Sequence, residues 1–149
     1  MNRDEFVKRY YEVAERALIL AQKARRVGLL ELEDDIDLEK VEERDIFEYG
    51  LRFIVDGTDK DIVNGILSNI ITHEKDEYLI LLKNIQKEAI LLIQYGMTPT
   101  IIHAMLNSYT DLSIKDDETK KVLDKITEEW IKWREENRKK IEEKKHDES

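Results

Sequence analysis

The chain offers few residues whose types and spacing suit metal chemistry. His73 and Glu77 lie four residues apart, which in a continuous helix would place two metal ligands on one face. No second histidine or further ligand set accompanies them, so we expect no metal site. His73 instead falls on an apolar stripe with Ile66 and Ile70, which favours a hydrogen-bonded histidine in the core.

The sequence also shows no motif for nucleophilic catalysis or for phosphate binding. The chain has three histidines and no cysteine, and it lacks a glycine-rich phosphate loop or a hydroxyl with a recognisable base. We therefore predict a protein that is not an enzyme, with no catalytic residues and no cofactor. The pair Asp56 and Gly57 is typical of a turn that closes one helix before the next.

The distribution of charge around Gly28 is more informative. Residues 1–26 carry seven basic and four acidic side chains, whereas residues 31–48 carry ten acidic and two basic ones. Arg25 and Arg26 end the basic part, and Glu33 lies in the acidic part. Taken alone, this pattern indicates two arginines that satisfy a helix end, followed by a solvated acidic loop.

Composition limits the class of protein. With 149 residues, of which 41% are apolar and 40% charged, the chain can bury one core. We expect one domain over residues 1–145 and a disordered tail over 146–149. The formal charge of -9 opposes binding to nucleic acid, and the absence of cysteine suits the cytoplasm. No apolar segment approaches the roughly 18 residues of a membrane span, so we expect a soluble chain.

The elements that position these residues are expected to be helices. The pattern predicts an all-α fold, a compact domain of about five to seven helices with a long charged C-terminal helix. We expect the first helix over 4–26, with Gly28 as its left-handed C-cap, and a short helix over 29–33. Residues 34–43 are too polar for the core. Asp45 is expected to cap a helix that ends at Gly57.

The second half begins with a long apolar pattern. After a cap at Thr58 or Asp59, one stripe is expected to contain Ile62, Ile66, Ile70 and His73. We expect this helix to continue through residues 78–95 to Gly96. Thr98 and Pro99 then open a helix with a predicted apolar face of Ile101, Ile102, Met105 and Leu106. The last helix is predicted over 118–145.

Trp130 and Trp133 on this last helix allow two interpretations. They continue three- and four-residue steps from Leu123 and Ile126 to Asn137, which is typical of a short coiled-coil seam. Tryptophans are good interface anchors, so a homodimer is one hypothesis. The other is that both tryptophans cover the core of their own chain. Two heptads do not decide between them.

Three segments together resemble a known family. Residues 24–33, 47–57 and 71–74 resemble, in order and spacing, the cytoplasmic domain of MotA, a stator subunit of the bacterial flagellar motor. MotA is related to the ExbB and TolQ proton-channel proteins. The resemblance covers about residues 18–74, and the chain lacks the membrane spans of the family.

The resemblance implies a protein-interaction module of the flagellar motor. Arg25 and Glu33 occupy, relative to Gly28, the places where MotA proteins have charged residues that engage the rotor switch protein. Arg26 could fill the basic role equally well. The implied partner is the rotor switch complex or another motor component. The implied location is cytoplasmic, peripheral at the flagellar base on the inner membrane.

The residues alone also allow a helical dimerisation or adaptor protein unrelated to motility. Under the two hypotheses together, the candidate partner-binding residues are Arg25, Arg26, Glu33, Trp130 and Trp133.

Overall fold

Helices form every regular element that the structure describes. The computed structural model describes residues 1–111 and 117–147, and within the last helix it places only part of the side chains. Over these residues the elements are α1 (Arg3–Val27), the 3-10 helix η1 (Leu29–Asp35), α2 (Leu38–Glu42), α3 (Ile46–Val55), α4 (Lys60–Ile71), α5 (Glu77–Tyr95), α6 (Pro99–Asn107) and α7 (Asp117–Asp147). The predicted all-α class is confirmed.

Local capping explains where most helices begin. Each N-cap side chain accepts a hydrogen bond from a backbone N–H in the first turn, which satisfies a donor that the helix itself cannot. This holds for Asn2, Asp37, Asp45, Asp59, Asp76 and Thr98. Asp45 and Asp59 therefore cap as predicted, and Thr98 with Pro99 opens α6 as expected.

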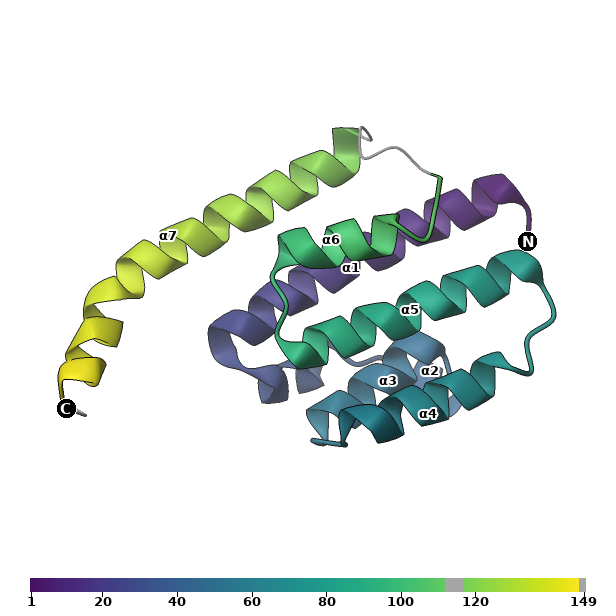
Figure 1. Ribbon diagram of the computed structural model, residues 1–149, viewed down its shortest axis with the longest axis horizontal. Helices are drawn as coiled ribbons and strands as arrows, with labels where there is room; N and C mark the ends of the chain where they lie inside the picture. Colours follow the sequence, from purple (N-terminus) through teal and green to yellow (C-terminus); the bar gives the residue numbers. More distant parts are fainter. Residues whose placement is uncertain (112–116, 148–149) are drawn as a thin grey trace.

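The helix α5 lies at the centre of the bundle and contacts α1, α3, α4 and α6 (Figure 1). The amine of Met1 donates to Asp76 at 2.7 Å, and Arg25 donates to the carbonyl of Gly96, so α1 and α5 run parallel. The hydroxyl of Tyr10 lies 3.4 Å from the Asn107 side-chain oxygen, which places the end of α6 beside the start of α1. The helix α6 is therefore antiparallel to both.

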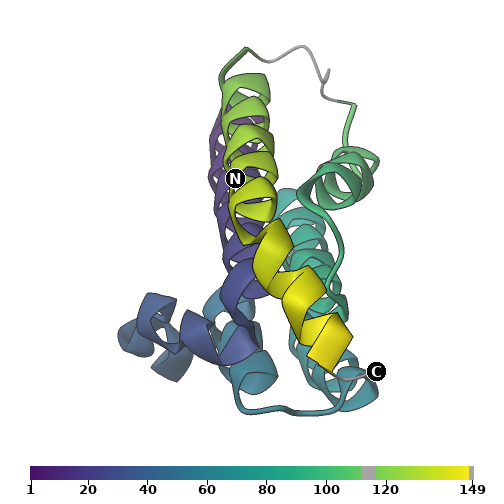
Figure 2. The same ribbon diagram turned by 90° about the vertical axis from the view of Figure 1, so that its left-hand side faces the viewer.

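The last helix lies across this bundle. Its early part contacts α1 and α6, and its later part extends beyond the end of α1 (Figures 1 and 2). Ile126 is 5% exposed and belongs to the core. No helix in the described part of the chain is long and apolar enough to span a membrane. The helix reaches Asp147, residues 148–149 lie outside the described part, and the boundary at 145 remains a prediction.

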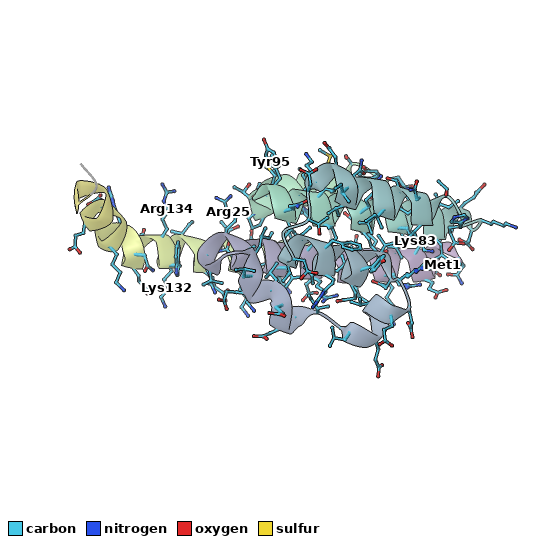
Figure 3. The ribbon with its side chains drawn as sticks, turned by 90° about the horizontal axis from the view of Figure 1, so that it is seen from below. Met1, Arg25, Lys83, Tyr95, Lys132 and Arg134 are labelled. Atoms are coloured by element: carbon cyan, nitrogen blue, oxygen red, sulfur yellow. The ribbon has the colours of Figure 1, made fainter. Side chains whose placement is uncertain are left out.

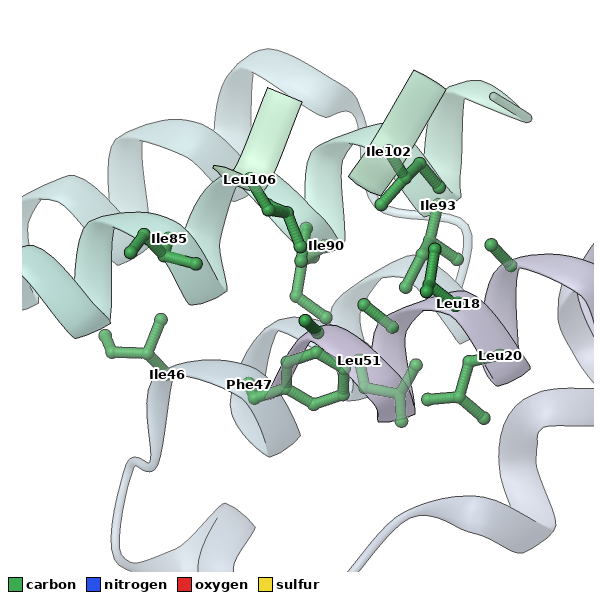
Figure 4. Packing of buried hydrophobic residues seen from close by; sticks show 14 of the residues in the cluster. Leu18, Leu20, Ile46, Phe47, Leu51, Ile85, Ile90, Ile93, Ile102 and Leu106 are labelled. Carbon is green, nitrogen blue, oxygen red and sulfur yellow. The ribbon is translucent and has the colours of Figure 1, made fainter. Parts of the chain in front are cut away.

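One core joins α1, α3, α5 and α6 (Figure 4). Ile46, Phe47 and Leu51 of α3 face Ile85 and Ile90 of α5, and the cluster continues to Leu18, Leu20, Ile93, Ile102 and Leu106. These side chains are all at most 3% exposed. Gly50 allows the close approach of α3, because a Cβ there would meet Ile90 and Leu67 at 3.0 Å.

The expected phase and length of the helix after Gly57 are wrong. The buried stripe of α4 is Val63, Leu67 and Ile71, one residue later than predicted, and Ile62 is 56% exposed. The residue types could not fix the phase because apolar residues occupy both stripes. The helix also ends at Ile71, and a new helix begins at Glu77 because Asp76 caps it.

The expected apolar face of α6 is half correct. Ile102 and Leu106 are fully buried, whereas Ile101 is 48% and Met105 is 40% exposed. Pro99 and His103 complete the buried face instead. The helix α6 contacts α1, α5 and α7, and the side that carries Ile101 and Met105 remains at the surface. The predicted polar segment 34–43 does stay out of the core, although it contains the short helix α2.

Candidate functional site

The corner between α1 and η1 contains three of the predicted interaction residues. Gly28 forms this corner with φ 98° and ψ 160°, and its N–H donates to the Ala24 carbonyl at 2.8 Å. The positive φ agrees with the expected need for glycine, but the ψ value lies outside the left-handed helical region. The backbone therefore leaves α1 abruptly and enters η1 at a sharp angle.

The corner exposes apolar side chains beside its charges. Val27 is 56% exposed and Leu30 is 73% exposed, whereas Leu32 is fully buried and anchors η1 to the core. Glu33 is exposed on the same 3-10 helix, and Arg26 is half-buried at the end of α1. We call Arg25, Arg26, Val27, Leu30 and Glu33 the corner surface.

Arg25 has a structural contact as well as an exposed position. Its Nη1 donates to the carbonyl of Gly96, the left-handed residue that ends α5, and so ties the ends of two parallel helices together. Figure 3 shows Arg25 pointing the same way as Arg134 of α7, with Lys132 on the opposite side of that helix. We expected an arginine to bind the carbonyl groups at the end of its own helix, but Arg25 binds a carbonyl group at the end of α5.

A network of ion pairs holds η1 in place behind the corner surface. Lys23 donates to the Asp35 carboxylate at 2.7 Å, and Arg16 Nη2 donates to the Asp35 carbonyl at 2.8 Å. The other arm of Arg16 donates to Glu48, which is 1% exposed. Glu48 also accepts from the Asp37 N–H at 2.9 Å, so one buried carboxylate joins α1, α3 and the entry to α2.

The environment of this network shifts its ionisation. Burial lowers the pKa of the Arg16 guanidinium, although the nearby carboxylates of Asp45 and Asp35 oppose that effect. The hydrogen bond to Asp35 raises the pKa of Lys23. Burial also raises the pKa of Asp45, the cap of α3, against the opposing charge of Lys40. Burial therefore disfavours the charged forms of Arg16 and Asp45, whereas the hydrogen bond to Asp35 favours charged Lys23.

His73 and Glu77 do not form the arrangement that their spacing suggested. His73 is exposed after the end of α4, so its predicted core position is wrong. Glu77 begins the separate helix α5, which removes the helical geometry that would align the two side chains. Among the described residues, no three His, Asp or Glu side chains gather as metal ligands do. Asp56 ends α3 before Gly57 at φ 78°, as the turn interpretation predicted.

The tryptophan pair is described in part. Trp133 is half-buried on α7, and its carbonyl accepts from the Asn137 side chain of the same helix at 2.8 Å. The side chain of Trp130 lies outside the described residues. Ile126, the second residue of the predicted seam, packs into the core of its own chain. The intermolecular seam therefore remains a prediction.

Comparison with known proteins agrees with the resemblance seen in the sequence. The chain is 35% identical over 92 residues to Motility protein A of Treponema pallidum (strain Nichols), and 33% identical over 92 residues to Motility protein A of Treponema phagedenis. The chain is similar to Motility protein A over these 92 residues. Each match covers 61% of this chain and 34% of the relative. The chain therefore spans about a third of the length of the curated relatives it matches.

Other comparisons add no family or fold assignment. No protein-family model matches the chain. No solved structure matches it.

Some residues of the corner were not predicted from the sequence. Val27 and Leu30 lie within the segment that carries the resemblance, but only their exposure identifies them as surface residues. Arg16 and Glu48 lie 32 residues apart, and Glu48 looked like one more member of an acidic run. A signal was present, since Glu48 lies between core residues on the predicted helix, where a carboxylate needs a partner.

Proposed function

We propose that this chain is a non-enzymatic protein-interaction module of the flagellar motor. It resembles the rotor-facing part of a stator subunit, and it docks through the charged residues Arg25, Arg26 and Glu33. The observation that carries the proposal is the 35% identity over 92 residues to a relative named Motility protein A. Because the match covers about a third of that relative, the motor role is proposed for docking alone.

The composition of the corner surface supports docking. Interfaces combine a few buried apolar or aromatic anchors with a polar rim. Leu30, at 73% exposed, and Val27, at 56%, supply apolar area that water must leave when a partner binds. The flanking charges then orient the partner and raise the association rate more than they raise affinity.

The rigidity of the corner surface also supports docking. Leu32 anchors η1 from below, and the Lys23–Asp35 ion pair holds its end at 2.7 Å. A surface that is already ordered loses less conformational entropy when it binds. We place the partner in the rotor switch complex or another motor component, and the chain in the cytoplasm at the flagellar base.

The proposal is tested by recovery of the rotor switch complex on immobilised chain. Glu33→Lys, Arg26→Glu and Leu30→Ser should each reduce recovery, and recovery with the unchanged chain should fall as salt rises. Glu39→Lys is the matched control, because it makes the same charge change at an exposed position of α2. Unchanged recovery with both Glu33→Lys and Leu30→Ser would reject docking through this corner.

Arg25 needs separate treatment because it also holds the end of α5. Arg25→Glu should lower both recovery and the melting temperature, whereas Glu33→Lys should change the free energy of unfolding by less than about 0.5 kcal/mol. If Arg26→Glu abolishes recovery and Arg25→Lys leaves it unchanged, Arg26 is the docking arginine. A compensating charge reversal in the partner should restore part of the binding lost by Glu33→Lys.

The alternative is a helical dimerisation or adaptor protein unrelated to motility. The extension of α7 beyond the bundle and the 46% exposure of Ile131 favour it (Figure 1). Alanine at both Trp130 and Trp133 should then convert a dimer to a monomer while helicity remains. If both side chains cover the core, the same change should cost about 3 to 5 kcal/mol per tryptophan and melt the domain. Light scattering with circular dichroism distinguishes these results.

A further inference from the structure

A polar cleft lies between α1, the start of α3 and α5. It consists of two adjoining hollows with volumes of about 190 and 220 Å³, which share the lining residues Arg9, Asp45, Leu82 and Gln86. An engineered cavity of about 150 Å³ holds benzene, so either hollow has room for a small molecule. None of the five residues of the corner surface lines either hollow.

Gln86 is the unusual member of this lining. The residue is 8% exposed, and its side-chain amide has no hydrogen-bond partner in the described part of the chain. The amide of Gln22 is fully enclosed, whereas that of Gln86 is open to the cleft, because Gln86 lines both hollows. Native proteins rarely leave a buried amide without partners. A molecule that pairs with this amide offers one acceptor and one donor.

Two arginines of the larger hollow are available to an anion. Arg9 belongs to α1 and Arg44 lies between α2 and α3, and both are exposed. Neither guanidinium forms a hydrogen bond or ion pair with another described residue. Lys83 lines the same hollow, but its amine already donates to Glu74 at 2.8 Å. A carboxylate is the natural partner of such guanidinium groups.

The backbone of Arg44 has an uncommon conformation. Its φ is 57°, the only positive value of a non-glycine residue in the described ranges. The Asp45 N–H donates to the Lys40 carbonyl at 3.0 Å, so Arg44 occupies the left-handed position after α2, where glycine is usual. Residues in rare backbone conformations gather at ligand sites. This favours a binding role for the Arg44 side chain.

An acidic group lies in the same hollow. Asp45 caps α3 by accepting from the Glu48 N–H at 3.0 Å, and Glu43 also lines the hollow. Burial raises the pKa of Asp45, against the opposing charge of Lys40, because burial penalises the ionised carboxylate. A cation bound to Asp45 would offset this penalty. The hollow therefore offers partners for both signs of charge.

We propose that the larger hollow binds a free α-amino acid with an apolar side chain. Its carboxylate accepts from Arg9, Arg44 and the Gln86 Nε2. Its ammonium group donates to Asp45 and to the Gln86 Oε1. Its side chain contacts the apolar part of the wall, which consists of Ile46, Leu79 and Leu82. Binding of this zwitterion does not depend on docking at the corner surface.

The test compares three probes with the same hydrocarbon part. Leucine has both charged groups, 4-methylpentanoate lacks the ammonium group, and 3-methylbutylamine lacks the carboxylate. Titration of the ¹⁵N-labelled full chain at neutral pH should shift the Gln86 side-chain amide signals saturably with leucine, with a Kd of about 1 mM. The other two probes should each bind about tenfold more weakly, since each leaves one sign of charge without a partner. Binding of either probe as tightly as leucine would overturn the proposal.

Substitution of Gln86 tests the position of the bound molecule. Gln86→Leu keeps the approximate side-chain volume and removes the amide, so it should weaken leucine binding about tenfold. The backbone amide signals of Leu79 and Leu82 report binding in this variant. Gln22→Leu is the matched control, because Gln22 is also buried, at 4% exposed, and lies outside both hollows. Equal leucine affinity in the two variants would reject binding beside Gln86.

Two charge variants test the zwitterion and keep the test valid if Gln86→Leu does not fold. Asp45→Asn preserves a side chain that caps helices and removes the negative charge, so leucine should lose its advantage over 4-methylpentanoate. Arg9→Gln should weaken leucine binding about threefold, whereas Lys8→Gln, at a neighbouring exposed position outside the cleft, should not. A retained preference for leucine in Asp45→Asn would contradict the proposed contact with the ammonium group.

The last variant separates binding from stability. Arg44→Gly relieves the left-handed backbone and removes the guanidinium, so the melting temperature should stay the same or rise while leucine binding weakens. Full leucine affinity in this variant would contradict the role of Arg44. Gln86→Leu should leave recovery of the rotor switch complex intact, and Glu33→Lys should leave leucine binding intact. Failure of either proposal can therefore be recognised without the other.

Discussion

Glu48 and Arg16 show how single residues hold the corner. Glu48 is 1% exposed, and its two oxygens accept from Arg16 and from the Asp37 N–H. A buried carboxylate is costly to desolvate, and removal of it would leave Arg16 and Asp37 without this acceptor. The guanidinium of Arg16 also lies 4.8 Å from the Phe47 ring centre, which adds a cation–π contact.

Glu48→Ala should therefore lower the free energy of unfolding by about 3 kcal/mol. This value is the lower limit for breaking a buried ion pair, and we choose it because Arg16 is partly exposed to solvent. Asp56→Ala is the control, since it breaks the exposed ion pair with Arg52 at 3.3 Å and should cost less than about 1 kcal/mol. Urea unfolding followed by circular dichroism measures both. Equal losses would contradict the structural role of Glu48.

Glu74 makes the free energy of unfolding depend on pH. The hydrogen bond from Lys83 at 2.8 Å lowers the pKa of Glu74, and the N–H groups of Lys75 and Asp76 add to the effect. A folded-state pKa below the ordinary 4.5 means that ionised Glu74 stabilises the fold above pH 4.5. This stability is lost as the pH falls through the lower folded-state pKa.

Glu74→Gln should reduce stability at neutral pH and remove part of the loss seen between about pH 5 and pH 3. Lys83→Met should have a smaller effect in the same direction, because the N–H groups of Lys75 and Asp76 still stabilise ionised Glu74, and the double variant should differ little from Glu74→Gln. Urea unfolding at several pH values provides the measurement. Additive effects would show that the two side chains act separately.

At the scale of elements, the crossing of α3 over α5 depends on Gly50. A Cβ at this position would lie 3.0 Å from two atoms of Ile90 and 3.0 Å from Leu67, and both neighbours are fully buried. Fully buried side chains have little room to move aside. Gly65 of α4, by contrast, has no atom within 4 Å of a Cβ built there.

Gly50→Ala should destabilise the protein by about 1 to 3 kcal/mol through overpacking, despite the better helix propensity of alanine. Gly65→Ala should stabilise it by about 0.5 to 1 kcal/mol, because there the propensity acts without a clash. We predict that the two substitutions change the free energy of unfolding in opposite directions, and thermal and urea unfolding of both variants measure these changes. A stabilising Gly50→Ala would show that α3 can move away from α5.

At the scale of the whole molecule, α7 divides into a packed part and an extension. Ile126 belongs to the common core, whereas Arg138, Glu142 and Glu143 are exposed. Figure 2 shows the extension passing across the end of the bundle toward the C-terminus. Exposed charged residues of this kind contribute little to the free energy of unfolding.

Removal of residues 138–147 should therefore change the free energy of unfolding by less than about 0.5 kcal/mol. Chains that end at residue 121, before Ile126, should lose much more, because Ile126 is a fully packed contact between α7 and the bundle. Thermal unfolding of the two truncations provides the comparison. A large loss from the first truncation would place the extension within the folded core.

The sequence by itself determined the helical class and most helix ends. Caps such as Asp45, Asp59 and Thr98 act on backbone groups within three residues, and Gly96 ends α5 through its own φ. These effects are local, so the order of residue types contains them. The resemblance to MotA also depended on local segments, and the comparisons support it.

Only the tertiary structure decided which faces are buried and which distant residues meet. Apolar residues lie on two neighbouring stripes of α4, and packing against α5 selected Val63 and Leu67 rather than Ile62 and Ile66. The pairing of Arg16 with Glu48 and the cleft beside Gln86 join parts of the chain far apart in sequence. Such contacts depend on how whole helices fill the core, and no periodicity within one helix specifies them.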